Sequence, residues 1–234
     1  MPVLTATHGQ PRVPAGILAM RATATQPQHV EATTIERHPN GIRRTFIKGE
    51  ELFAEGDPAE FFYKVVSGTV RTCKLLSDGR RQIEAFHLPG DIFGLENGQD
   101  HRFTAEAVED VVVVSFRRNR FTSLLHDDPA FGDQLMSSMI CSLERAHDHM
   151  VLLGRKTAQE KLATFLLDMA NRLSKGDRFD LPMQRTDIAD HLGLTIETVS
   201  RTLTQLVRDG LIKFGAAGRT IILNNRARLQ QLNA

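Results

Sequence analysis

The sequence predicts an α+β chain with an N-terminal β-roll (jelly roll), a long helix and a C-terminal winged helix-turn-helix. Three observations lead to this fold class. Short strand-like runs separated by turn signals fill residues 41–116, as is typical of a sandwich or jelly roll. Apolar residues recur at helical spacing from residue 119 onward. Two capped helices and a glycine-bounded hairpin follow residue 185, which is the pattern of a winged helix-turn-helix.

Composition limits the class of protein. The chain has 234 residues, enough for two cores, and its 41% hydrophobic and 24% charged residues are ordinary for a globular protein. No apolar run approaches the roughly 18 residues of a membrane span, and the patch "PAGILAM" is too short for a signal peptide. Cys73 and Cys141 form no metal-type cluster and favour a reducing compartment. We therefore expect a cytoplasmic protein with no membrane segment.

The first 117 residues divide into two parts. Residues 1–30 are rich in Thr, Ala, Gln, Pro and His without periodicity, and we expect a flexible arm. Residues 31–117 should form the β-roll, in which Asp78-Gly79 is a hairpin turn. His87 is expected in a loop.

Residues 118–153 are predicted to form a dimerisation helix. Six apolar residues recur there at alternating spacings of three and four, which defines a heptad seam. Such a seam packs either against a second copy or against the chain's own body, and we favour a parallel homodimer. We expect Cys141 to be a small buried hydrophobe, and His147 and His149 to face solvent. The seam consists of Met136, Met139, Leu143, Ala146, Met150 and Leu153.

Residues 154–234 are predicted to form the DNA-binding domain. "TAQE" has the form of a capping box that begins a helix at Thr157. Thr186 is expected to cap a second helix, which ends at Gly193, and Thr195 a third. The segment contains 13 Lys and Arg against 8 Asp and Glu, and an excess of basic residues favours a nucleic-acid partner.

The third helix carries polar residues on the side opposite its apolar face. In a helix-turn-helix the N-terminal part of the second of the motif's two helices enters the major groove. There Arg201 could donate two hydrogen bonds to guanine, Glu197 could accept from cytosine, and Ser200 could touch thymine or phosphate. Alternatively, Glu197 and Arg201 only pair across one helical turn, which stabilises a helix by about 0.2–0.5 kcal/mol. Flanking side chains that would position the protein on phosphates are Arg185, Thr186, Thr195, Thr198, Lys213 and Arg219.

Residues 30–230, with "GLTIETVSRTLTQLVRDGLI", resemble the CRP/FNR superfamily of bacterial transcription regulators. The "E-x-x-S-R" pattern is similar to the FNR and FixK branch. The resemblance implies a homodimer that reads a TTGA-N6-TCAA palindrome and activates RNA polymerase. Glu197 and Arg201 would then read the G·C pair, Ser200 the adjacent thymine, and Ile196 a thymine methyl group. The turns "SDGR" (77–80) and "SKGDRF" (174–179) would contact the polymerase, or are plain solvated turns.

The sequence departs from both cofactor-binding branches of that superfamily. Residues 1–72 contain no cysteine, so the four thiolates of an iron–sulfur cluster are missing. Leu95 stands where cyclic-nucleotide binders have a Glu, and His101-Arg102 stands where they have Arg-Ser. We therefore expect no cofactor, as the FixK-like "GDIFGLE" also implies.

Two alternatives remain open. One is a ligand- or haem-gated sensor of the same superfamily. The other is a β-barrel enzyme of the cupin type, which needs clustered His and Glu ligands. Residues 41–116 contain only His87 and His101 without ligand-like spacing, so this reading is poor and we expect no enzyme activity.

Overall fold

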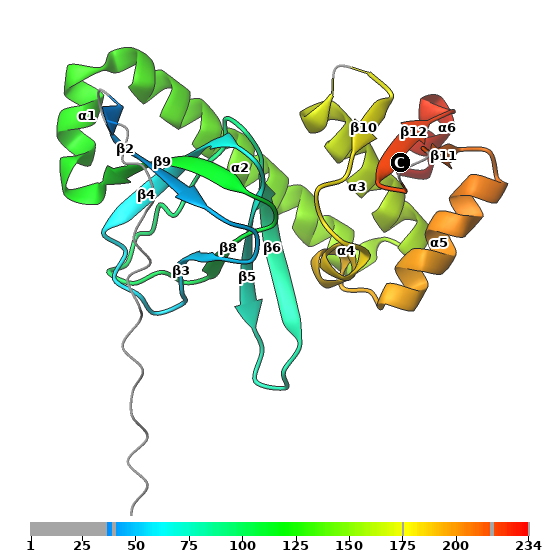
Figure 1. Ribbon diagram of the computed structural model, residues 1–234. Coiled ribbons are helices and arrows are strands. Elements are labelled where there is room, and N and C mark those ends of the chain that lie inside the picture. Colours follow the sequence, from blue (N-terminus) through cyan, green and yellow to red (C-terminus); the bar gives the residue numbers. More distant parts are fainter. Residues whose placement is uncertain (1–36, 39–40, 175, 216–217, 234) are drawn as a thin grey trace, which may run out of the picture. The chain divides into compact units, whose positions relative to one another are not determined.

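The computed structural model describes residues 37–38, 41–174, 176–215 and 218–233 (Figure 1). The predicted flexible arm, residues 1–30, lies outside the described residues. Among those described, no helix is both long enough and apolar enough to cross a membrane.

The N-terminal part is a β-roll of two antiparallel sheets, as predicted. One sheet has the strand order β1-β2-β9-β4-β7 and the other β3-β8-β5-β6, and neither closes on itself. Strands β5 and β6 form the predicted hairpin, where Gly79 adopts φ 84°, a conformation that glycine tolerates without strain. The strands are β1 Arg37–His38, β2 Gly41–Phe46, β3 Glu51–Phe53, β4 Phe61–Ser67, β5 Val70–Leu75, β6 Arg81–His87, β7 Ile92–Phe93, β8 Thr104–Ala107 and β9 Val111–Arg117.

The segment predicted as one helix over residues 118–153 contains three. The short helices η1 (Arg118–Arg120) and α1 (Phe121–Asp127) precede the long helix α2 (Pro129–Arg155). The break has a local cause, because Pro129 occupies the first turn of α2 and the Asp128 side chain accepts a hydrogen bond from the Phe131 amide. Proline suits a first turn but disrupts a helix interior.

The C-terminal part is a winged helix. Its elements are α3 (Ala158–Leu173), β10 (Arg178–Asp180), α4 (Arg185–Leu192), α5 (Ile196–Arg208), β11 (Ile212–Phe214), β12 (Thr220–Leu223) and α6 (Arg226–Asn233). The predicted hairpin is β11 and β12, and β10 joins it in the order β10-β12-β11. Its connecting loop includes residues 216–217, which lie outside the described part of the chain.

The caps that begin these helices were mostly predicted. Thr157 and Glu160 form the expected capping box at α3, and Thr195 caps α5. The prediction for Thr186 was wrong, because Gln184 is the N-cap residue of α4. The backbone amide of Gln184 donates a hydrogen bond to the Asp187 carboxylate at 3.1 Å, as in a capping box, so α4 begins two residues earlier than a cap at Thr186 would allow.

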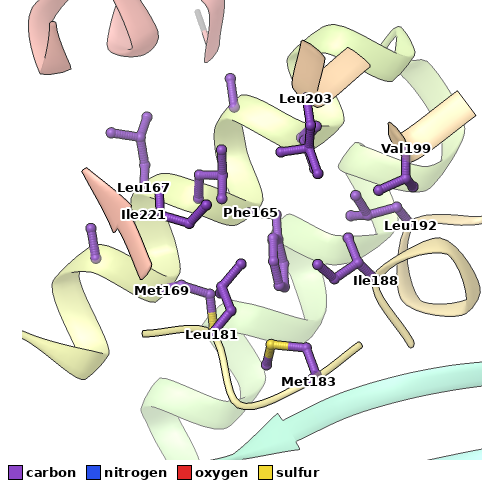
Figure 2. Close-up of a cluster of buried hydrophobic side chains, with 14 of the residues drawn as sticks. Phe165, Leu167, Met169, Leu181, Met183, Ile188, Leu192, Val199, Leu203 and Ile221 are labelled. Atoms are coloured by element: carbon purple, nitrogen blue, oxygen red, sulfur yellow. The ribbon is translucent and has the colours of Figure 1, made fainter. Parts of the chain in front are cut away.

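The winged-helix core brings together apolar faces of several elements. Phe165 of α3, Ile188 of α4, Leu203 of α5 and Ile221 of β12 are all at most 3% exposed and turn toward one another (Figure 2). Burial of each large side chain contributes roughly 1.5–3 kcal/mol. The core therefore fixes how α5 lies against α3 and α4.

Candidate nucleic-acid interface

The orientation of helix α5 is fixed by the turn that begins it and by its buried inner face. Gly193, in the left-handed conformation with φ 61°, ends α4, and the Thr195 side chain accepts a hydrogen bond from the Thr198 amide at 3.2 Å. Along the inner face, Val199, Leu203 and Leu206 are at most 2% exposed. The opposite face of α5 is therefore held toward solvent by local signals and core packing together.

The side chains predicted to read bases lie on this outer face. Glu197 and Arg201 are exposed, Ser200 is partly buried, and Ile196 is 40% exposed. No ion pair within 4.0 Å joins Glu197 to Arg201 in the described structure. The two exposed side chains therefore do not form a close ion pair, although the Arg201 charge is near enough to act on Glu197.

The Glu197 carboxylate is stabilised in its charged form. Hydrogen bonds from its own backbone amide and the Thr195 hydroxyl, with the nearby Arg201 charge, hold the pKa of Glu197 below its usual range. An ionised carboxylate accepts hydrogen bonds but donates none. This suits it to a base-edge amino group such as that of cytosine.

Arg185 links the two helices of the motif. Its guanidinium donates to the Ser200 hydroxyl at 3.4 Å and lies 5.7 Å from the centre of the Phe214 ring. A residue predicted to contact phosphate thus touches one predicted to read a base. This contact joins the starts of α4 and α5 to the first strand of the wing.

The remaining predicted phosphate contacts fall into two groups. Thr186, Thr195 and Thr198 lie in the first turns of α4 and α5, and the Thr195 and Thr198 hydroxyls are 3.1 Å apart. Lys213 of β11 and Arg219, just before β12, are exposed on the wing. The structure thus places Thr195 and Thr198 at the start of α5 and Thr186 at the start of α4, and it places Lys213 and Arg219 on the wing.

The predicted seam lies on α2. Met136, Met139, Leu143 and Met150 are between 46% and 63% exposed, and Ala146 is exposed too. Leu153 differs, since it is partly buried against the winged-helix core. Among the described residues, the chain's own body therefore does not cover this apolar row, apart from Leu153.

Three minor expectations were wrong. His149 is partly buried and stacks on His191, whereas His147 is exposed as expected. His87 is buried at the end of β6 rather than in a loop, and Cys141 is exposed rather than buried. Sequence alone does not fix which face of a long helix the neighbouring elements cover.

The comparisons with known proteins agree with this architecture. A model of the Crp-like helix-turn-helix domain matches residues 160–232, and one of the cyclic nucleotide-binding domain matches residues 43–128. The nitrogen fixation regulation protein FixK of Azorhizobium caulinodans is 46% identical over 199 residues, which are 83% of this chain and 80% of that protein. FixK of Rhizobium meliloti is 39% identical over 214 residues, 90% of this chain and 98% of that protein.

A solved structure is similar over most of its length. FixK2 from Bradyrhizobium japonicum matches with a TM-score of 0.77 at 50% identity, covering 83% of this chain and 98% of that one. Its likeness spans the β-roll, the long helix and the winged helix together. The chain therefore belongs to the CRP/FNR family of DNA-binding transcription regulators.

Proposed function

We propose that this regulator is a cytoplasmic, homodimeric activator without catalytic activity. It reads a TTGA-N6-TCAA-like palindrome through α5, and needs neither a cyclic nucleotide nor an iron–sulfur cluster. The observation that supports this most directly is the outer face of α5. Glu197 and Arg201 are exposed there without pairing to each other, beside Ser200.

The roles of the reading residues follow from their chemistry. Arg201 donates two hydrogen bonds to guanine, and the ionised Glu197 accepts one from the paired cytosine. Ser200 and Ile196 contact thymines. Phosphates are held by Arg185, Thr186, Thr195, Thr198, Lys213 and Arg219, which set position rather than sequence.

Dimerisation through α2 presents two reading helices to the DNA. The exposed row from Met136 to Met150 offers an apolar stripe to the same stripe of a second copy. A two-fold symmetric dimer of this kind matches a palindrome, because each subunit meets an identical half-site.

Several features of the β-roll support operation without a nucleotide. Leu95 occupies the place of a ribose-binding Glu, and Arg102 is exposed, with its amide donating to Glu96. A carboxylate that could bind a ribose is therefore missing at position 95.

RNA polymerase is the proposed protein partner. Several relatives are named transcriptional activators, among them AadR of Rhodopseudomonas palustris. The tip of the β5–β6 hairpin, residues 77–80, is exposed next to Leu75, which is 68% exposed. We propose that this tip and the segment 174–179 contact the polymerase, although residues 178 and 179 of that segment belong to strand β10 and not to a turn as predicted.

A ligand-gated sensor is the second candidate, and a cavity favours it. A cavity of about 290 Å³ is lined by residues of β6, α2, α3 and α4, among them Phe86, Phe165, His149 and Arg145. A bound chromophore such as haem would appear in the absorbance spectrum of the purified protein. Its appearance would favour this candidate over the effector-free activator.

The proposed function is tested by fluorescence anisotropy with purified protein and no added ligand. Binding to a TTGA-N6-TCAA duplex is compared with binding to a scrambled duplex over a salt series. We expect a preference for the palindrome of roughly 10³-fold or more. Equal and steeply salt-dependent binding to both duplexes would reveal only phosphate attraction and contradict the proposal.

A further inference from the structure

A cluster of charged side chains joins the β-roll to the first helix of the DNA-binding motif. Arg71 of β5 contacts Glu106 of β8 at 2.6 Å and Asp187 of α4 at 2.9 Å. Arg81 of β6 contacts the same oxygen of Asp187 at 2.7 Å, and donates to Asp190 at 2.9 Å. We call these five residues the Asp187 cluster.

The Asp187 carboxylate has two roles in this cluster. One oxygen accepts from both guanidinium groups, and the other accepts from the Gln184 amide that begins α4. Its side chain is only 5% exposed. Isolated surface ion pairs contribute little, but a shared, largely buried carboxylate with charge-assisted bonds holds its partners more firmly.

The other end of α4 is held to the same strand. The His191 ring nitrogen Nδ1 donates to the Ile83 carbonyl oxygen at 3.1 Å. The side-chain amide of Gln82 donates to the His191 carbonyl oxygen at 3.3 Å. Both ends of α4 are thus bonded to β6. Two separated attachments restrict rotation of α4 on the β-roll as well as translation.

We propose that the Asp187 cluster sets the spacing between the two half-sites that the dimer reads. This inference rests on the proposed function. Arg71 and Arg81 are positioning residues, which act on the DNA through α4 and its packing partner α5. With α2 joining the two subunits, a fixed angle between the β-roll and α4 in each subunit fixes the distance between the two reading helices.

The geometry of DNA makes this arrangement selective. Adding one base pair to the spacer moves a half-site by about 3.4 Å and turns it by roughly 35° about the helix axis. A rigid attachment cannot follow both changes without breaking bonds of 2.7–2.9 Å. A loosened attachment can follow both changes, so the dimer would also bind palindromes with a wrong spacer and would discriminate less between spacer lengths.

The test compares full-length wild-type protein with Arg81→Met. Methionine keeps the apolar stem but removes the contacts to Asp187 and Asp190, while Arg71 and the Gln184 amide still satisfy Asp187. Anisotropy measures affinity for the palindrome, for palindromes with the spacer one base pair shorter or longer, and for a duplex with a single half-site. Lys74→Met is the matched control, because it removes an exposed ion pair of the β-roll, between Lys74 and Glu55 at 2.7 Å, that lies outside the cluster.

We expect Arg81→Met to reduce the preference for the correct spacer by roughly fivefold or more, with single half-site affinity within about twofold of wild type. Arg81→Lys should restore part of the preference, and Lys74→Met should behave as wild type. An unchanged spacer preference in folded Arg81→Met would overturn the inference. Equal loss on all duplexes, half-site included, would show a merely structural role and overturn it too.

The same data separate this inference from the proposed function. If wild-type protein does not prefer any palindrome over a scrambled duplex, the proposed function fails, and the inference with it. If wild-type protein prefers the palindrome but Arg81→Met discriminates between spacers just as well, only the inference fails. Thermal unfolding of each variant confirms that the comparison is made between folded proteins.

Discussion

The imidazole rings of His149 on α2 and His191 on α4 stack face to face, with centroids 4.1 Å apart and planes inclined by 15°. Burial, with smaller effects from His149 and Arg172, lowers the pKa of His191 to about 3. Burial also lowers the pKa of His149, and Lys161 adds to this effect. Both rings are therefore neutral at neutral pH, and protonating either one opposes the packing of α4 on α2.

We predict that acid destabilises the fold through His191. Between about pH 3 and pH 6.5 the unfolded chain binds a proton at this histidine that the folded chain excludes. The free energy of unfolding therefore falls as the pH is lowered through that window, by up to about 1.4 kcal/mol per pH unit for one group. Urea unfolding at pH 7.5 and 5.0 should show a smaller decrease for His191→Gln than for wild type. His147→Gln, at an exposed position, is the control, and equal decreases in all three proteins would contradict the prediction.

Arg201→Ala should remove the preference for the palindrome without unfolding the protein. Arg201 is exposed and makes no ion pair within the described structure, so little stability depends on it. Losing one bidentate base contact in each half-site should reduce discrimination by about 2–6 kcal/mol for the dimer. Anisotropy against palindrome and scrambled duplexes measures this, with circular dichroism to verify the fold. A variant that keeps the wild-type preference would refute the role of Arg201.

Glu197→Ala should change which base is tolerated rather than weaken binding everywhere. Its ionised carboxylate can accept a hydrogen bond from the amino group of cytosine, and its negative charge repels acceptor atoms on a base edge. We expect discrimination at the matching base pair to fall by about 1–3 kcal/mol per half-site, while affinity for the remaining positions persists. A panel of duplexes with each base substituted at that pair provides the measurement. Uniform loss across the panel would indicate a contact to phosphate instead.

Leu143→Glu should separate the dimer. Leu143 is 57% exposed in the row on α2, and a charge without a partner at a buried interface is destabilising by about 3–5 kcal/mol. Sedimentation velocity should then show monomers at concentrations where wild type is dimeric. Cys141→Glu is the matched control, because residue 141 is exposed and lies roughly 200° around the helix from Leu143. The proposed interface is wrong if the two variants associate equally well.

Local signals predicted much of the winged helix. Thr157, Thr195 and Gly193 act within one or two turns of their own helix, so capping rules locate those ends. The prediction for Thr186 failed because threonine is the better N-cap by preference, whereas a capping box between Gln184 and Asp187 begins α4. The apolar seam on α2 was visible in the sequence as a repeat. The start of α2 was not, because apolar residues at helical spacing continue across Pro129.

Contacts between distant segments could not be predicted. Arg71 and Asp187 are 116 positions apart in the sequence, and no spacing rule connects them. The stacking of His149 on His191 likewise depends on how α4 lies against α2, which the helical period of either segment leaves open. The outer face of α5 was predictable because α4, the turn that follows it and the cap of α5 are all close to α5 in the sequence.

The contact of Arg185 with Ser200 and Phe214 has a consequence for the thermodynamics of DNA binding. A long guanidinium side chain loses rotamer freedom whenever a phosphate or base immobilises it, and this loss opposes association by about 0.5–1.5 kcal/mol per side chain. Arg185 is already held between Ser200 and the Phe214 ring before DNA arrives. Part of its entropy is therefore lost during folding, which leaves a smaller entropic penalty for the encounter with the promoter.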